Sequence, residues 1–155
     1  MAASLLDVLL AASLAVSVVT DLRERRILNV VTLPALALAL LVRAAGGGLA
    51  SGLLGVATAS LPFFLLAWRG AMGMGDVKLM AVVGACVGAE RIAPVLLAIA
   101  LVGGLQGVLA LLWTGSLGRT LRRLLLRGAV PQAAAVTLPY GVSIALGTAW
   151  VWLGL

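Results

Sequence analysis

The chain has 155 residues, of which 63% are hydrophobic and only 10% are charged, whereas a soluble domain carries about 25% charged residues. Its mean hydropathy is +1.22, and the core of a soluble domain of this size could not bury so much apolar surface. The composition therefore excludes soluble classes of protein and indicates an integral membrane protein. The net charge of +6 does not indicate nucleic-acid binding, because the basic residues stand in short loops between apolar runs, as membrane topology requires.

Six apolar runs divide the chain at its charge clusters, glycines and prolines. Each is near the roughly 20 residues that a helix needs to cross about 30 Å of hydrocarbon. The runs cover residues 2–20, 27–45, 49–68, 75–93, 94–114 and 131–155. The sequence therefore predicts an all-α integral membrane protein, a bundle of six transmembrane helices that forms a single domain over residues 1–155.

The fourth run is the weakest span, because only 11 uncharged residues separate Lys78 from Glu90. That is about half the length needed to cross. We therefore expect this helix to begin at or before Asp76 and to include Glu90 and Arg91 in its last turn. Asp76 then stands in the first turn of a helix near the membrane surface, where Lys78 can extend its ammonium group to the interface.

The basic residues predict the orientation of the bundle. The first, third and fifth loops, with Lys78 counted in the third, hold nine of the eleven Lys and Arg residues, and only Arg43 and Arg91 fall on the other side. By the positive-inside rule these three loops are cytoplasmic and both termini lie outside. In the fifth loop, GSLGRTLRRLLLRGAV (residues 115–130) places leucines on one helical face and arginines four apart. It predicts a short amphipathic helix on the cytoplasmic surface, held by anionic lipid, with substrate docking as the less favoured alternative.

Two of the five acidic residues are predicted at one membrane depth. Asp21 ends the first run and Asp76 begins the fourth, so both fall near the cytoplasmic surface on two helices of a small bundle. Two carboxylates at the edge of a low-dielectric medium suit aspartic-protease chemistry, in which the pair shares one proton and activates water. Gly73 and Gly75, just before Asp76, are expected to adopt conformations closed to other residues and to let a peptide substrate approach.

The chain lacks most of the residues that other hydrolytic mechanisms need. The sequence has no histidine and one cysteine, Cys86, which excludes Ser-His-Asp and Cys-His pairs as well as a Cys/His zinc site. We expect neither a metal nor another cofactor. Ser-Lys chemistry through Lys78 remains formally open, but Ser116 or Ser143 would have to be brought to it by the fold.

At these residues the chain resembles a known family. Gly73-Met74-Gly75-Asp76 matches the GxGD motif of intramembrane aspartic proteases, and with Lys78 it resembles the GxGDxK form of the type IV prepilin peptidase family. DLRERRILN (residues 21–29) resembles the stretch around that family's first catalytic aspartate, and LPYGVSIALG (residues 138–147) resembles its closing helix. The resemblance implies that Asp21 and Asp76 are catalytic, and that the residues binding substrate or shaping the site are Gly73, Gly75, Lys78, Pro139, Tyr140 and Gly141.

The resemblance also implies a substrate and a place in the cell. Such an enzyme removes the basic leader peptide of a type IV-like prepilin at the cytoplasmic face of the prokaryotic inner membrane. Leu28 and Val142 stand where the family usually has proline, which affects backbone shape rather than chemistry. Bifunctional members carry paired CxxC motifs linked to N-methylation, and the single Cys86 instead makes the chain similar to the peptidase-only branch associated with Flp, or tight-adherence, pili.

Two other function classes fit the same features. In a small ion- or proton-coupled transporter, Asp21 and Asp76 would bind a cation at a broken helix, a site expected near the bilayer midplane. In a non-catalytic assembly factor, stripes of small residues would pack against partners. We expect these stripes, which include Gly84 in the fourth run and Gly103 with Gly107 in the fifth, to be contact faces between helices, and Gln106 to bond another helix.

Overall fold

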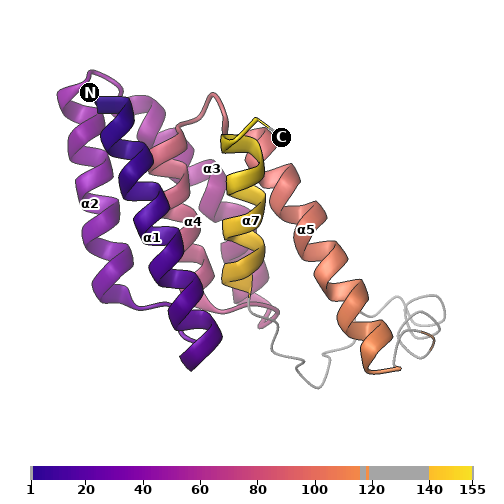
Figure 1. Ribbon diagram of the computed structural model, residues 1–155. Helices are drawn as coiled ribbons and strands as arrows, with labels where there is room; N and C mark the ends of the chain where they lie inside the picture. The colour runs from indigo at the N-terminus through magenta and orange to yellow at the C-terminus, as the bar shows by residue number, and fades with distance from the viewer. Residues whose placement is uncertain (1, 116–117, 119–139, 155) are drawn as a thin grey trace.

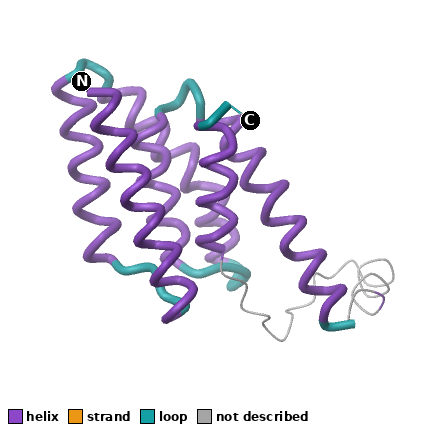
Figure 2. The backbone as a smooth tube through the Cα atoms, viewed as in Figure 1, coloured by secondary structure: helices purple, strands orange, loops and turns teal. Residues whose placement is uncertain are grey.

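A computed structural model gives the structure of residues 2–115, 118 and 140–154, and these residues form a bundle of helices (Figure 1). No strand occurs within these ranges; helices and short linkers account for the described backbone (Figure 2). The fold is thus all-helical as predicted. The amphipathic helix predicted in the fifth loop lies outside the described residues. The helices are α1 (Ala2–Glu24), α2 (Asn29–Ala45), α3 (Leu49–Trp68), α4 (Met74–Val87), α5 (Ile92–Trp113) and α7 (Tyr140–Trp152).

Three of these helices are long and apolar enough to cross a membrane. They are Ser4–Glu24 within α1, with 21 residues, α3 with 20 and α5 with 22, and they make the chain a multi-pass membrane protein. The other helices are shorter, with 17 residues in α2, 14 in α4 and 13 in α7. At 1.5 Å per residue, α4 is only about 21 Å long. Six full spans therefore remain a prediction.

The fourth run begins as predicted but ends early. Its helix starts at Met74, before Asp76, whereas the prediction that Glu90 and Arg91 belong to its last turn is wrong. Gly88 stops the helix because it adopts φ 81°, a left-handed conformation that favours glycine. Its N–H donates to the Gly84 carbonyl at 2.9 Å. Glu90 and Arg91 consequently lie in the linker to α5.

Helix α4 is the centre of the bundle. It packs against α1, α2, α3 and α7, and Figure 1 shows it enclosed by these neighbours. Nearly its whole surface is buried, including Leu79, Met80, Val82 and Val83. A helix that is apolar on every face is stable only in such a central position. The aspartate in its first turn is therefore held in the most enclosed element of the fold.

Small residues allow the closest helix contacts. A Cβ at Gly55 of α3 would overlap the Gly84 carbonyl of α4, and the reverse substitution would overlap Gly55, so the expected contact face at Gly84 is confirmed. Gly103 faces Ser143 of α7 at an ordinary distance, but no atom lies within 4 Å of a Cβ built at Gly107. The expectation for Gly107 is therefore wrong among the described residues, because α5 diverges from the bundle at that point (Figure 1).

One polar bond links α5 to α7. The Ser143 hydroxyl donates to the Gln106 side-chain oxygen, which confirms the expectation that Gln106 bonds another helix. Such bonds join helices in an apolar environment that offers few other partners.

The linkers and termini separate into two ends. The N- and C-termini lie at one end (Figure 1), where the Trp152 indole N–H donates to Asp7 at 3.1 Å. The linkers from α1 to α2 and from α3 to α4 lie at the opposite end (Figure 2). Asp21 and Asp76 belong to that second end, because one stands in the last turn of α1 and the other in the first turn of α4.

Candidate active site

The two aspartates line one small cavity. It has a volume of about 230 Å³ and lies where α1 ends and α4 begins. Asp21 and Asp76 are each only 8% exposed, although they are far apart in the sequence. The remaining lining residues come from the linker after α1 and from the start of α4, and they are Arg25, Arg26, Ile27, Gly73 and Gly75.

Asp21 is held by the start of α7. The backbone N–H of Gly141 donates to Asp21 Oδ2 at 2.9 Å, in a buried contact. The first N–H groups of a helix have no partner within the helix, so the carboxylate completes the N-terminus of α7. A Cβ at Gly141 would lie 2.8 Å from the same oxygen. The bond therefore depends on glycine at this position.

Asp76 stands in the first turn of α4, and Gly73 is the residue that precedes this helix. Gly73 is extended, with φ −79° and ψ 147°, and its carbonyl accepts the Asp76 N–H at 3.2 Å. Any residue adopts this conformation, and Gly75 is already helical, so the expectation of unusual backbone angles at Gly73 and Gly75 is wrong. The positive φ of this linker occurs at Gly70, with φ 72°. A Cβ at Gly73 would instead stand 3.5 Å from Asp76 Oδ2.

Gly75 makes room for the chain itself. A Cβ at this position would lie 2.9 Å from the Ile27 Cβ, a distance that side chains do not tolerate. The linker that follows Asp21 therefore packs directly on the first turn of α4. The space that we predicted for a substrate backbone at Gly75 is occupied by Ile27, and this contact sets how closely the two aspartate-bearing segments approach.

Lys78 lies outside the cavity and makes a specific bond. Its ammonium donates to the Asn29 side-chain oxygen at 2.7 Å. Asn29 is the first residue of α2, so this bond fastens the start of α2 to the start of α4. In the sequence, Asn29 is only the last residue of the DLRERRILN motif. Its contact with Lys78 could not be identified without the fold.

Of the two remaining predicted site residues, Tyr140 and Pro139, the structure describes only Tyr140. Tyr140 begins α7 and is half-buried, and Pro139 lies outside the described residues. Arg25 and Arg26 line the cavity, although the sequence analysis did not name them as site residues. The signal for them was their position four and five residues after Asp21. They add positive charge beside the two carboxylates.

Ser143 and Lys78, a pair that Ser-Lys chemistry would need, are not brought together in the structure. Across the described ranges, no three His, Cys, Asp or Glu side chains gather so as to hold a metal ion. Ser143 bonds Gln106 and Lys78 bonds Asn29, so these two residues do not form a pair, while Ser116 lies outside the described residues. What the geometry offers is two enclosed carboxylates on one cavity, which suits activation of a water molecule.

Comparison with known proteins adds one finding. Residues 8–111 match the type IV leader peptidase family, and this is more than half of the chain. The match contains Asp21 and the whole stretch from Gly73 to Lys78, and it ends before α7. No curated protein and no solved structure gives a significant match.

Proposed function

The chain belongs to the type IV leader peptidase family, and from this premise we propose that Asp21 and Asp76 are its catalytic pair. The enzyme is a prepilin leader peptidase, an aspartic endopeptidase. The observation that carries the proposal is that both aspartates line the same cavity, which has a volume of about 230 Å³. Acids that faced lipid or separate cavities could not act on one water molecule.

In the proposed mechanism the two carboxyl groups share one proton. The ionised carboxylate takes a proton from a water molecule as the water oxygen attacks the scissile carbonyl carbon, while the protonated partner donates to the carbonyl oxygen. The tetrahedral intermediate then collapses, the C–N bond breaks, and a carboxyl group returns a proton to the leaving nitrogen. The products are a free leader carboxylate and a new amino terminus on the pilin.

Surrounding contacts support the pair by holding its geometry. The Gly141 N–H fixes the Asp21 carboxylate from α7. The contact of Ile27 with Gly75 joins the two segments beside the cavity, and the bond from Lys78 to Asn29 braces α4 on α2. We propose positioning roles for Lys78, Gly75 and Gly141, and a substrate-facing role for Gly73. Tyr140 and Pro139 are proposed to shape the same end of the groove.

The proposed substrate is a prepilin of the Flp type. This follows from the resemblance to the peptidase-only branch and from the single cysteine, Cys86, which is buried in α4. A basic leader followed by an apolar segment would lie across the end of the bundle, with its leader on the side of the charged linkers. The excess of Lys and Arg at that end supports a cytoplasmic location for the site and an outer location for both termini. The four arginines in the sequence of the fifth loop support the proposed contact of that loop with anionic lipid.

The position of the acids argues against the transporter alternative. A coupling site is expected near the bilayer midplane, but the cavity is built from the last turn of α1 and the first turn of α4. The same acids therefore fit a substrate that approaches from one membrane surface.

The test is leader cleavage in membranes or nanodiscs that contain the full chain and a Flp-type prepilin. Asp21→Asn and Asp76→Asn keep the shape of each side chain and remove its ability to ionise, so each is expected to abolish cleavage. Glu24→Gln is the matched control, because Glu24 is an exposed acid in the same turn as Asp21 and does not line the cavity.

Mass spectrometry of the released leader and of the pilin amino terminus locates the cut. Cleavage that persists in either folded asparagine variant would refute the catalytic pair. If the wild-type enzyme cleaves other type IV prepilins but leaves the Flp-type prepilin intact, the proposed substrate is wrong while the pair stands.

A further inference from the structure

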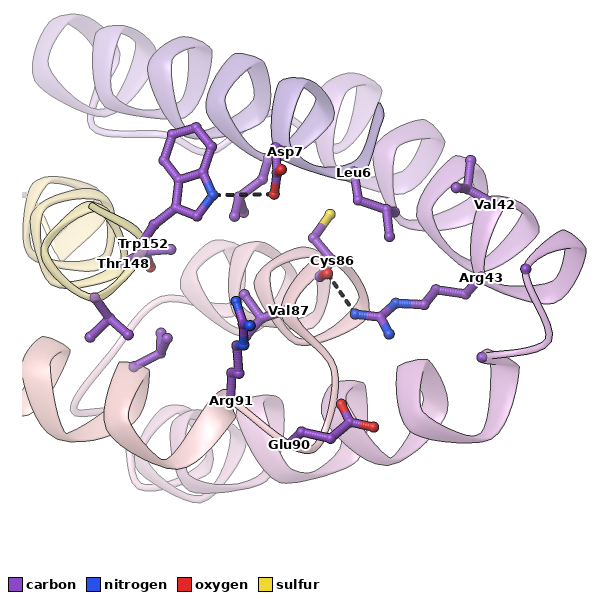
Figure 3. A pocket seen from close by; sticks show the side chains of 15 residues that line it. Leu6, Asp7, Val42, Arg43, Cys86, Val87, Glu90, Arg91, Thr148 and Trp152 are labelled. Atoms are coloured by element: carbon purple, nitrogen blue, oxygen red, sulfur yellow. Dashed lines mark hydrogen bonds between the residues drawn. The ribbon is translucent and has the colours of Figure 1, made fainter. Parts of the chain in front are cut away.

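A second, larger cavity lies at the end of the bundle that carries the termini. Its volume is about 560 Å³, within the roughly 300–1,000 Å³ typical of ligand pockets. It is formed by the start of α1, the end of α2, the linker between α4 and α5, and the end of α7 (Figure 3). None of its lining residues belongs to the aspartate cavity, and the proposed peptidase reaction does not use it.

Two arginines reach this cavity from different elements. Arg43 donates Nε to the Ala85 carbonyl at 3.1 Å and an Nη to the Cys86 carbonyl at 2.7 Å. These bonds satisfy carbonyls in the last turn of α4 and hold the guanidinium at the wall. Arg91 extends into the cavity from the linker between α4 and α5 (Figure 3). Its charge lies near Glu90, whose pKa it helps to lower.

Two carboxylates line the same space. Asp7 accepts the Trp152 indole N–H at 3.1 Å, and Glu90 accepts the Ser51 hydroxyl at 2.6 Å. The Ser51 bond, a backbone bond from Glu90 itself and the nearby Arg43 and Arg91 lower the pKa of Glu90, so this exposed group in the α4–α5 linker is ionised at neutral pH. Together with Asp7, Arg43 and Arg91, Glu90 gives the cavity two acidic and two basic side chains.

A buried hydroxyl in the wall of the cavity has no partner. Thr148 of α7 is 1% exposed, and its Oγ1 forms no hydrogen bond with the described residues. Buried polar atoms nearly always have a partner in a native structure, so one left alone at a cavity points to a bound polar group. Around these polar groups the wall is apolar, through Leu10, Val95 and Val151 among others. The cavity thus combines charged binding groups with a surface suited to hydrocarbon.

The depth of the cavity indicates which ligand is available. The helices α1 and α5 are both candidate membrane spans, and both begin at this end of the bundle, beside the cavity. The beginning of a span lies near the layer of lipid headgroups. A ligand here is therefore met at the membrane surface, with its apolar part in the bilayer.

We propose that this cavity binds the headgroup of a phospholipid that carries both a phosphate and a primary ammonium, that is, a phosphoethanolamine headgroup. Arg91, with Arg43, binds the phosphate, since guanidinium groups match phosphate oxygens. Asp7 and Glu90 accept hydrogen bonds from the ammonium. The balance of charges favours this zwitterion over an anionic headgroup, because a purely negative ligand would stand beside two carboxylates without compensating them.

Native mass spectrometry of the full chain tests the proposal. The protein is released from nanodiscs that contain equal amounts of phosphatidylethanolamine, phosphatidylglycerol and phosphatidylcholine. We expect preferential retention of phosphatidylethanolamine, and a fall of about tenfold in its retention in Arg91→Gln, which removes a charged phosphate contact. Arg69→Gln is the control, since it removes the same charge from the linker at the opposite end and is expected to retain the lipid like wild type.

A second variant tests the ammonium contact separately. Asp7→Asn removes one of its two acidic partners, so the preference for phosphatidylethanolamine over phosphatidylglycerol is expected to shrink while phosphate binding persists. Circular dichroism establishes that each variant is folded.

Several outcomes would overturn the assignment. Equal retention of the three lipids, unchanged retention in folded Arg91→Gln, or an unchanged preference in folded Asp7→Asn would each contradict it. Stronger retention of phosphatidylglycerol by wild type would mean that the cavity selects an anion. If soluble O-phosphoethanolamine competes as well as the lipid does, the ligand is a free phosphate ester and the lipid source is wrong.

Discussion

Gly141 donates its backbone N–H to the Asp21 carboxylate at 2.9 Å, across 120 residues of sequence. The bond joins the beginning of α7 to the last turn of α1 beside the aspartate cavity. An alanine Cβ at this position would lie 2.8 Å from the accepting oxygen, so the carboxylate would have to turn away. Gly141→Ala is expected to lower kcat/KM for leader cleavage by about tenfold or more, the effect of losing a charge-assisted hydrogen bond.

The control for this variant is Gly104→Ala, because no atom lies within 4 Å of a Cβ at Gly104. It is expected to cleave like wild type. Wild-type activity in Gly141→Ala would show that the bond does not position Asp21.

Gly73 and Gly75 should respond differently to the same substitution. Gly75→Ala forces the added methyl group against the Ile27 Cβ, so we expect both a lower melting temperature and lower cleavage activity. Gly73→Ala meets the chain only at ordinary van der Waals distance, so the melting temperature should hold and the effect should be confined to KM and kcat. Thermal unfolding in detergent and steady-state kinetics separate the two. Equal loss of stability in both variants would contradict the distinction.

The bond between Lys78 and Asn29 predicts coupling in a double-mutant cycle. Both Lys78→Met and Asn29→Leu remove the 2.7 Å hydrogen bond, so each is expected to lower cleavage several-fold, and the double variant should be little worse than either one. Asn29→Asp keeps an acceptor for the ammonium and should retain activity. Additive losses would indicate that Lys78 acts independently, for example as a membrane anchor.

The contact between Gly55 and Gly84 predicts a stability effect remote from the cavity. An added methyl group on either residue overlaps backbone atoms of the facing helix, and backbone cannot move aside as a side-chain tip can. Gly55→Ala and Gly84→Ala are therefore each expected to destabilise the bundle by about 1–3 kcal/mol. Melting temperatures measured against Gly104→Ala test this. An unchanged melting temperature would mean that α3 and α4 separate at no cost.

Much of the architecture could be predicted because it depends on local properties of the chain. A run of apolar residues must become a helix in lipid, where backbone groups find no water, and this rule located the helices and the membrane class. The end of α4 was misplaced because counting residues for a span took no account of Gly88, which stops the helix locally. The GxGD stretch and DLRERRILN identified Asp21 and Asp76 as candidates before any fold was known.

By itself the sequence determined that this is a helical membrane protein and that most of its Lys and Arg residues fall in alternate loops. It also identified two aspartates as the residues to consider for catalysis. Only the tertiary structure decided what those residues touch: Gly141 on Asp21, Ile27 on Gly75, Asn29 on Lys78, and the two arginines around a second cavity. The physical reason is that hydropathy and helix length depend on neighbouring residues. Contacts between helices depend instead on how distant segments pack in three dimensions. There, the absence of a side chain at one glycine sets how closely two segments of the chain approach.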